Sequence, residues 1–338
     1  MNKPLAFVTG ATGLVGSHLL YGLLQKGYRV RALKRQQSAV SQVLQTFSLY
    51  TAAADTLFRQ IEWTEGELLD FHCMSEIVRG CTQVYHLAAI VSFNHADKEK
   101  MMRINVEGTK NIVNLCIDKN IPLCHVSSTG ALGRSETDDP ITENDLWQTN
   151  RGRSAYAYSK YQSEMEIWRG IAEGLQAVVV NPAVILGPCD RTKGSSEFFS
   201  QVKRGMRFHT SGITAFVDVR DVTRCMLQLM EQERYGERFI LSAGNMSYRE
   251  LFSLIADGFK MKRPAIAVQP WMLNVAYRMA WLAGKLTGKS PALTKETANS
   301  AFQQIRYSSE KVRKTLEFGF ISIEKSVEDG CRYWESKN

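Results

Sequence analysis

The sequence predicts an α/β fold, a doubly wound parallel sheet with helices on both faces and a smaller, mostly helical C-terminal lobe. Short apolar, β-branched runs alternate with amphipathic stretches from residue 5 to residue 181, the pattern of a parallel sheet covered on both faces. A glycine-rich turn follows the first of these runs, and the alternation weakens after Pro188. With 338 residues, 44% of them hydrophobic and 22% charged, the chain can form one large domain with an appendage.

The expected elements of the first half follow from local periodicity, taken in chain order. Leu5–Thr9 is expected as a strand, and leucines at helical spacing from Leu14 to Leu24 predict a helix that Gly27 ends. Residues 36–58 are expected to form a helix and a long connection. Further strands are expected at Tyr28–Leu33, Gln60–Trp63, Gln83–Leu87, Pro122–Ser127 and Ala177–Asn181, and further helices at Met101–Lys119 and Tyr156–Glu173.

The second half predicts a smaller lobe beside the sheet. Phe216–Val217 and Phe239–Leu241 are expected as short strands that return to the sheet or its edge, and residues 248–333 as mostly helical. We therefore expect a main domain of residues 1–188 with the return segment 215–243, and a lobe of residues 189–214 and 244–338. Such a lobe would cover the carboxyl edge of the sheet, where ligands sit in open α/β sheets.

Composition narrows the class of protein. The first strand begins at once, without a secretory leader, and no run reaches the length of a membrane span, so we expect a cytoplasmic protein with no transmembrane segment. The apolar stretch 271–286 favours a buried or groove-lining helix, with a membrane-surface helix as the alternative. Seven scattered cysteines without a Cys-x-x-Cys pair favour free thiols and no metal site. The net charge of +8 is spread out, which favours attraction of small anions over nucleic-acid binding.

The glycine-rich turn predicts a dinucleotide site. Gly10 permits a tight turn after the first strand, Gly13 lets the backbone approach a pyrophosphate, and Gly16 lets the helix pack closely on the strand. The N-terminus of that helix offers unpaired N–H groups to the phosphates. The cofactor contacts expected from this turn are Gly10, Thr12, Gly13, Leu14 and Val15.

The end of the second strand predicts which dinucleotide binds. An acidic residue there would hold a ribose 2′-hydroxyl, but this chain has Lys34 and Arg35, with Arg31 earlier on the same strand. A guanidinium suits a 2′-phosphate. We therefore expect NADP(H) to be preferred over NAD(H), with a solvated basic strand end as the alternative interpretation.

Tyr156 and Lys160 form a candidate proton-transfer pair. They are four residues apart at the start of a predicted helix, so they share one face. A nearby ammonium stabilises a phenolate, so Lys160 is expected to lower the pKa of Tyr156. Ser128, at the end of the fifth strand, would hydrogen-bond the same substrate oxygen. The predicted catalytic group is Ser128, Tyr156 and Lys160, with Tyr156 and Lys160 also touching the cofactor.

Together these motifs resemble the extended branch of the short-chain dehydrogenase/reductase superfamily, the NAD-dependent epimerase/dehydratase family with a Rossmann-type domain. The Gly-x-x-Gly-x-x-Gly spacing is typical of that branch, and further matches are His86–Ala89, Asn105–Thr109, Pro182–Pro188 and Phe216–Val222. Gly66–Asp70 resembles the family's Gly-Asp-Leu segment, with Glu67 in place of Asp. The resemblance implies that the cofactor also contacts Glu67, Leu68, Ala88, Ala89, Ser127, Pro182 and Val184.

Two departures bear on the substrate. Where nucleotide-sugar enzymes of the family usually carry Val-Tyr-Gly, this chain has Ala131–Gly133, and where they usually carry Asn-Val-Tyr-Gly-Pro it has Val184–Pro188. These apolar residues resemble the dihydroflavonol reductase and hydroxysteroid dehydrogenase branch and imply a less polar ketone or aldehyde, or the matching alcohol. Gly133 stands where plant dihydroflavonol reductases have Asn, which argues against a flavonoid. Phe93, Thr129 and Leu186 are candidate substrate contacts.

Two alternatives stay open, and the family adds one expectation about assembly. The enzyme alternative is a nucleotide-sugar epimerase or dehydratase with transient cofactor reduction. The other is a non-catalytic NADP-binding regulatory protein, against which the retained Tyr156 and Lys160 count. The resemblance also implies a homodimer formed through the helices expected at Met101–Lys119 and Tyr156–Glu173.

Overall fold

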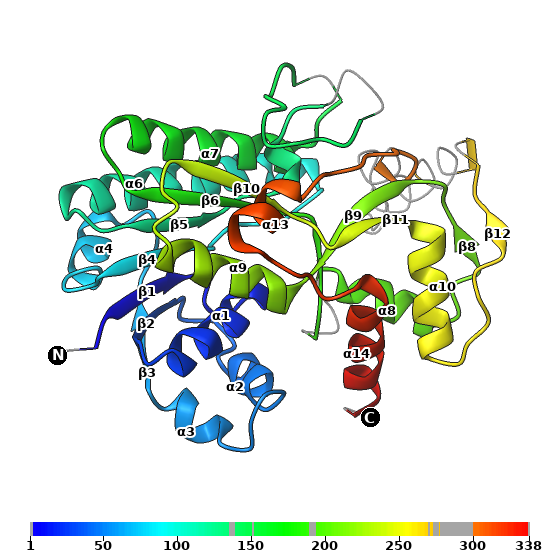
Figure 1. The fold of residues 1–338 in the computed structure, drawn as a ribbon, viewed down its shortest axis with the longest axis horizontal. Coiled ribbons are helices and arrows are strands. Elements are labelled where there is room, and N and C mark those ends of the chain that lie inside the picture. Colours follow the sequence, from blue (N-terminus) through cyan, green and yellow to red (C-terminus); the bar gives the residue numbers. More distant parts are fainter. Residues whose placement is uncertain are drawn as a thin grey trace.

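A computed structural model describes residues 3–134, 139–150, 152–188, 194–269, 271–272, 277 and 300–336 (Figure 1). Most of the stretch 271–286, for which a groove-lining or membrane-surface helix was expected, lies outside the described residues. Within the described part of the chain, no helix combines the length and the apolar character needed to cross a membrane.

The described elements alternate between strands and helices along most of the chain. The strands are β1 (Leu5–Thr9), β2 (Arg29–Lys34), β3 (Ile61–Glu65), β4 (Gln83–His86), β5 (Leu123–Val126), β6 (Ala177–Pro182), β7 (Val184–Leu186), β8 (Phe208–His209), β9 (Ile213–Asp218), β10 (Glu237–Leu241), β11 (Gly244–Ser247) and β12 (Ile266–Ala267). The helices are α1 (Leu14–Gln25), α2 (Ser41–Phe47), α3 (Ala54–Phe58), α4 (Phe71–Ile77), α5 (Lys98–Met101), α6 (Gly108–Asp118), α7 (Ala155–Ala172), α8 (Ser196–Lys203), α9 (Val219–Glu231), α10 (Tyr248–Gly258), α13 (Glu310–Leu316) and α14 (Ile323–Ser336). Short 3₁₀ turns lie at His95–Asp97 and Thr129–Ala131, and a π-helical turn at Met102–Glu107.

The central sheet confirms the predicted fold class. Its seven strands run in the order β10-β6-β5-β4-β1-β2-β3, and every neighbouring pair is parallel. The order reverses between β1 and β4, which is the topological switch point where a doubly wound sheet binds its ligand. Of the residues predicted to bind a cofactor, the glycine turn 10–15, Ala88 and Ala89 follow the carboxyl ends of these two strands.

Alternating side chains of the strands build two apolar cores, one on each face of the sheet. In β1, Ala6 and Val8 enter one core while Leu5 and Phe7 enter the other. The first core takes its helical side chains from α1, α2 and α9, and the second from α4, α6 and α7. Figure 1 shows these two sets of helices on opposite sides of the sheet. Burial on both faces explains why the strands are apolar runs without polar alternation.

Three local features differ from the expectation. The helix expected at Met101–Lys119 is interrupted by the π-helical turn at Met102–Glu107. Helix α4 was not predicted; it begins where the Asp70 carboxylate accepts a hydrogen bond from the Cys73 amide at 2.9 Å. β9 does not return to the central sheet, as was expected for Phe216–Val217, but pairs with β7 and β11 in a separate three-stranded sheet.

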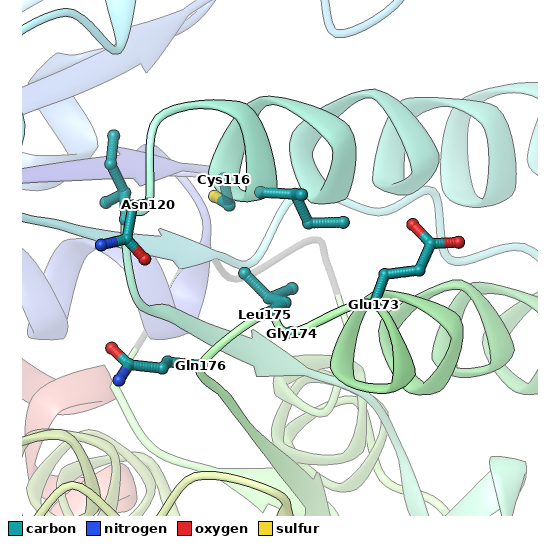
Figure 2. A pocket seen from close by; sticks show the side chains of 8 residues that line it. Cys116, Asn120, Glu173, Gly174, Leu175 and Gln176 are labelled. Atoms are coloured by element: carbon teal, nitrogen blue, oxygen red, sulfur yellow. The ribbon is translucent and has the colours of Figure 1, made fainter.

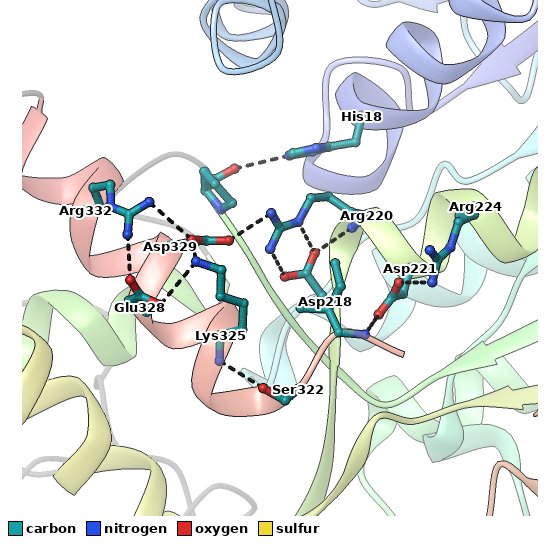
Figure 3. A network of polar contacts seen from close by, with 12 residues as sticks. His18, Asp218, Arg220, Asp221, Arg224, Ser322, Lys325, Glu328, Asp329 and Arg332 are labelled. Atoms are coloured by element: carbon teal, nitrogen blue, oxygen red, sulfur yellow. Dashed lines mark hydrogen bonds and ion pairs between the residues drawn. The ribbon is translucent and has the colours of Figure 1, made fainter. Parts of the chain in front are cut away.

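A third apolar core organises the smaller lobe. It joins side chains of α8, α10 and α14 to β7 and β9, with Phe199, Phe216 and Ile255 fully buried. A polar network fastens α14 to the corner between β9 and α9 (Figure 3). The Arg220 guanidinium pairs with Asp218 at 2.7 Å and with Asp329 of α14 at 2.9 Å. The division of the chain into a main domain of residues 1–188 with 215–243 and a lobe of residues 189–214 with 244–338 stays a prediction.

A small pocket lies at the amino edge of the sheet, where β5 and β6 begin (Figure 2). It is lined by Cys116, Ile117, Asn120, Ile121, Glu173, Gly174, Leu175 and Gln176. The predicted catalytic serine follows the other end of β5. This pocket is therefore separate from the candidate active site.

Candidate active site

The turn between β1 and α1 has the geometry that a pyrophosphate needs. Gly10 has a φ of +67°, and a Cβ there would lie 2.7 Å from the Ala88 amide nitrogen. A Cβ at Gly16 would lie 2.2 Å from the Gly10 carbonyl oxygen, so only glycine lets α1 approach this closely. No side chain caps the N-terminus of α1 at Gly13, and its first turn holds no acidic residue. These features fit a dinucleotide, with Thr12, Leu14 and Val15 in the same turn.

A buried chain of hydrogen bonds holds the ends of β1 and β4 together. Burial lowers the pKa of His86 to about 3, so the ring is neutral and has one donor and one acceptor. Thr109 donates to the Asn105 carbonyl oxygen at 2.5 Å, so it accepts from His86 Nε2 at 2.9 Å. Thr9 then donates to His86 Nδ1 at 2.8 Å and accepts from the Ala88 amide at 3.2 Å. The backbone at the predicted cofactor contact Ala88 is therefore fixed.

The basic residues of β2 are not equivalent. Arg31 pairs with Glu62 at 2.7 Å and donates to the Ile77 carbonyl, so it is occupied at the sheet. Lys34 pairs with Glu65 at 2.7 Å. Arg35 is exposed just past the strand and forms no ion pair among the described residues. Of the basic residues from which a 2′-phosphate contact was expected, Arg35 is the one whose charge is not already neutralised.

Ser128, Tyr156 and Lys160 come together at the carboxyl end of β5. Tyr156 and Lys160 lie in the first turns of α7, which Ser154 caps by accepting from the Ala157 amide at 3.0 Å. The Ser128 hydroxyl accepts from the Gly130 amide at 3.1 Å and lies beside the Tyr156 phenol. Lys160 is 3% exposed, and its ammonium donates to the Val126 carbonyl oxygen at 2.7 Å. This grouping can hold a carbonyl or hydroxyl oxygen between a serine and a tyrosine.

The pKa of Tyr156 differs from the expectation. It was expected to be lowered by Lys160, but burial raises the pKa of Tyr156, and the hydrogen bond from Ser128 opposes this rise. Burial also lowers the pKa of Lys160 to about 8, against the charge of Glu164, which raises it. The raised pKa favours the neutral phenol, which suits Tyr156 to donating a proton.

Two buried residues near this group were not predicted as site residues, although Asn105 begins the matched segment Asn105–Thr109. Asn105, in the π-helical turn, accepts from the Ile90 amide at 2.7 Å and donates to Ser159 on α7 at 3.0 Å. Glu164, one turn beyond Lys160, accepts from the Ser127 hydroxyl at 2.6 Å. Glu164 could have been predicted from its position, because it is a charged residue four places after Lys160 on a helix that packs on the sheet.

The remaining predicted contacts occupy different environments. Glu67 is exposed and Leu68 buried in the turn after β3, where the Leu68 carbonyl accepts from Asn111 at 3.0 Å. Pro182, the last residue of β6, is buried, and Val184, the first residue of β7, is half-buried. Since the Ser127 hydroxyl donates to Glu164, the prediction that Ser127 contacts the cofactor rests on its backbone.

The three predicted substrate contacts also lie in different environments. Phe93 is 43% exposed, and its ring lies edge-on to Tyr156 with the ring centroids 5.9 Å apart. Thr129 hydrogen-bonds the phenol of Tyr307. Leu186 is fully buried in the core of the lobe, so it packs there and offers a substrate no surface, contrary to the expectation. Among the described residues, no group of three or more His, Cys, Asp or Glu side chains is arranged to hold a metal.

Sequence comparison gives relatives with several activities in their names. The chain is 27% identical to a putative dihydroflavonol 4-reductase of Synechocystis sp., covering 98% of this chain and 94% of that protein. It is 29% identical to sterol demethylase protein B of Methylococcus capsulatus, covering 79% and 78%. It is 26% identical to cinnamoyl-CoA reductase 1 of Petunia hybrida, covering 75% and 76%.

Solved structures agree with the fold, and a family model shows the family. The crystal structure of gox2253 has a TM-score of 0.82 and 26% identity over 99% of each chain. That of the Bordetella bronchiseptica enzyme WbmG in complex with NAD has a TM-score of 0.74 and 17% identity, covering 99% and 95%, which supports the fold alone. The model of the NAD dependent epimerase/dehydratase family matches residues 6–242. The chain therefore belongs to this family of NAD(P)-dependent enzymes.

Proposed function

We propose that the protein is an NADP(H)-dependent oxidoreductase that reduces a ketone or aldehyde, or oxidises the matching alcohol. The observation that carries this proposal is the position of Ser128 beside the Tyr156 phenol, with Lys160 one turn further along α7. The group follows the carboxyl end of β5, two strands from β1 and its glycine turn. Proton-transfer side chains and a phosphate turn at one edge of a sheet are what hydride transfer to a carbonyl requires.

In this mechanism the side chains handle the proton. NADPH bound at the glycine turn would supply the hydride that the carbonyl carbon accepts. The Tyr156 phenol donates its proton to the carbonyl oxygen, which completes the alcohol, and burial favours the neutral phenol that this step needs. Ser128 hydrogen-bonds the same oxygen and orients it. The Lys160 ammonium stabilises the phenolate that Tyr156 becomes, and the resemblance to the family assigns it a second contact with the nicotinamide ribose.

The preference for NADP(H) is proposed from Arg35. It is the exposed cation beyond β2 without an ion pair among the described residues, whereas Lys34 is paired with Glu65. A guanidinium matches a phosphate with two parallel hydrogen bonds and offers a hydroxyl no acceptor. NAD(H) remains the alternative, since the family and the NAD-bound WbmG structure point to the dinucleotide without fixing its 2′-group.

The proposed substrate is a weakly polar carbonyl compound. The support is the apolar loop Val184–Pro188, the exposed ring of Phe93 beside Tyr156, and relatives named dihydroflavonol 4-reductase and cinnamoyl-CoA reductase.

We further propose a cytoplasmic homodimer that associates through α6 and α7. Light scattering tests the dimer, and a monomeric mass would refute it.

Turnover with a panel of compounds tests the proposal. Purified protein is mixed with NADPH and either aldehydes and ketones or nucleotide-sugars, and nicotinamide absorbance and products are followed. Net oxidation of NADPH by a carbonyl compound supports the reductase. Conversion of a nucleotide-sugar without net absorbance change would replace it with the epimerase or dehydratase activity.

A further inference from the structure

Two residues of α7, one turn apart, hold consecutive residues at the end of β5. The Lys160 ammonium donates to the Val126 carbonyl oxygen at 2.7 Å. Glu164 Oε2 accepts from the Ser127 hydroxyl at 2.6 Å. The segment that carries the catalytic serine is therefore fastened to α7 by one cation and one anion.

The same carboxylate also reaches the next residue of that segment. Asn181 of β6 donates through Nδ2 to the Ser128 carbonyl oxygen at 3.0 Å and to Glu164 Oε2 at 2.8 Å. The other carboxylate oxygen, Oε1, accepts from the Trp168 indole and from the Arg238 guanidinium, each at 3.2 Å. Glu164 is 1% exposed, so its charge is met by these donors and not by water.

Among the titratable groups around Lys160, Glu164 is the one whose charge favours the ammonium form of Lys160. His86 of β4 and His125 of β5 both face the ammonium, and burial lowers the pKa of each far enough that they are neutral near pH 7. Burial lowers the pKa of Lys160 to about 8, and the charge of Glu164 opposes that fall. Arg238 of β10, which is itself tied to the Glu143 carbonyl at 2.8 Å, lies on the far side of the carboxylate.

We propose that Glu164 is a positioning residue for the reaction, whose buried carboxylate keeps Lys160 in the ammonium form and fixes the segment Val126–Ser128 against α7. The proposal rests on the proposed function, because it acts through Lys160 and Ser128. A purely structural role would require the hydrogen bonds of Glu164 but not its charge. Variants that separate charge from hydrogen bonding therefore decide between the two.

Three variants make that separation. Glu164→Gln keeps the size of the side chain, removes its charge and replaces one acceptor oxygen with an NH2 group, so the loss of a hydrogen bond needs its own control. Glu164→Asp keeps the charge and withdraws it by one methylene. Trp168→Phe is the matched control, because it removes a donor from Glu164 Oε1 and leaves the charge in place.

The titration of Lys160 is the readout that a structural role would not move. It is followed by NMR on protein labelled with ¹³C at the lysine ε-carbon, with the Lys160 signal identified by its loss in Lys160→Met. We expect Glu164→Gln to lower the titration midpoint by about one pH unit, the lower end of the effect of a nearby opposite charge. Trp168→Phe should leave the midpoint unchanged, and Glu164→Asp should shift it in the same direction by less.

Turnover should follow the same order. A one-unit drop takes the ammonium fraction at pH 8 from about a half to about a tenth, so kcat/KM should fall about five-fold at pH 8 and by about a tenth at pH 6. An unshifted Lys160 midpoint in Glu164→Gln overturns the proposal; if that variant does not fold, an unshifted midpoint in Glu164→Asp does so. A shifted midpoint in an enzyme whose Tyr156→Phe variant still turns over would refute the proposed function and the role of Glu164 in the reaction, and would leave only its effect on the charge of Lys160.

Discussion

Replacing Arg35 should weaken the binding of NADPH without changing the binding of NADH. Arg35 is exposed just past β2, so its hydrogen bonds to a phosphate are partly screened by water. A charge-assisted hydrogen bond contributes about 1.5–3 kcal/mol when it is shielded, and we take about 1–2 kcal/mol for an exposed one. Arg35→Ala should therefore weaken NADPH binding about 5- to 30-fold and leave NADH binding unchanged, because NADH has no group for the guanidinium to hold.

The assay is a titration of both reduced cofactors by fluorescence, at two salt concentrations. Arg29→Ala is the matched control: it removes a cation from the other end of β2, where Arg29 lies 4.0 Å from Glu62. It should change both affinities little. An equal loss of NADPH and NADH binding in Arg35→Ala would refute the assigned contact, and tighter binding of NADH than NADPH by the unmodified protein would refute the NADP preference.

Other perturbations of the same site have equally definite outcomes. Gly16→Ala places a Cβ 2.2 Å from the Gly10 carbonyl oxygen, so we expect a loss of about 1–3 kcal/mol in urea unfolding and weaker NADPH binding; wild-type values for both would contradict this packing. Burial lowers the pKa of Lys160 to about 8, so kcat/KM should fall about tenfold per pH unit above that value, and a flat profile to pH 10 would exclude a role for the ammonium. Burial lowers the pKa of His86 to about 3, below the 6.5 of an unfolded chain. The free energy of unfolding is therefore independent of His86 protonation above pH 6.5 and falls on acidification, because the unfolded chain takes up this proton first. The loss reaches about 2 kcal/mol at pH 5. Urea unfolding at pH 7 and 5 should show that loss reduced in His86→Gln, and an unchanged loss would contradict it.

The strands of the central sheet were predictable because both of their faces are buried. Runs such as Leu5–Thr9 and Ala177–Asn181 are continuous apolar segments, and each lies in the sheet within a residue or two of its expected bounds. The place of β9 was not predictable in the same way. Phe216 is as apolar as a central-strand residue, but it is buried in the lobe core against α10, and local pattern does not say which core a strand joins.

The candidate site divides along similar lines. Gly10 and Gly16 were predictable because the backbone geometry there admits no other residue. Tyr156 and Lys160 were predictable because their spacing puts them on one helix face. The direction of the Tyr156 pKa was wrong, because burial depends on the whole fold while helical spacing shows only the neighbouring lysine. Glu164 joins partners from β5, β6 and β10, whose contacts exist only after the sheet has formed.

Turnover by Tyr156→Phe tests the central claim most directly. The variant keeps the ring that packs beside Phe93 and removes the hydroxyl that lies beside Ser128. With a carbonyl substrate that the unmodified protein reduces, we predict that NADPH still binds and that kcat falls by about 10²- to 10⁴-fold, the usual contribution of a positioned proton donor. Unchanged oxidation of NADPH by Tyr156→Phe would contradict the assignment of the proton-transfer group.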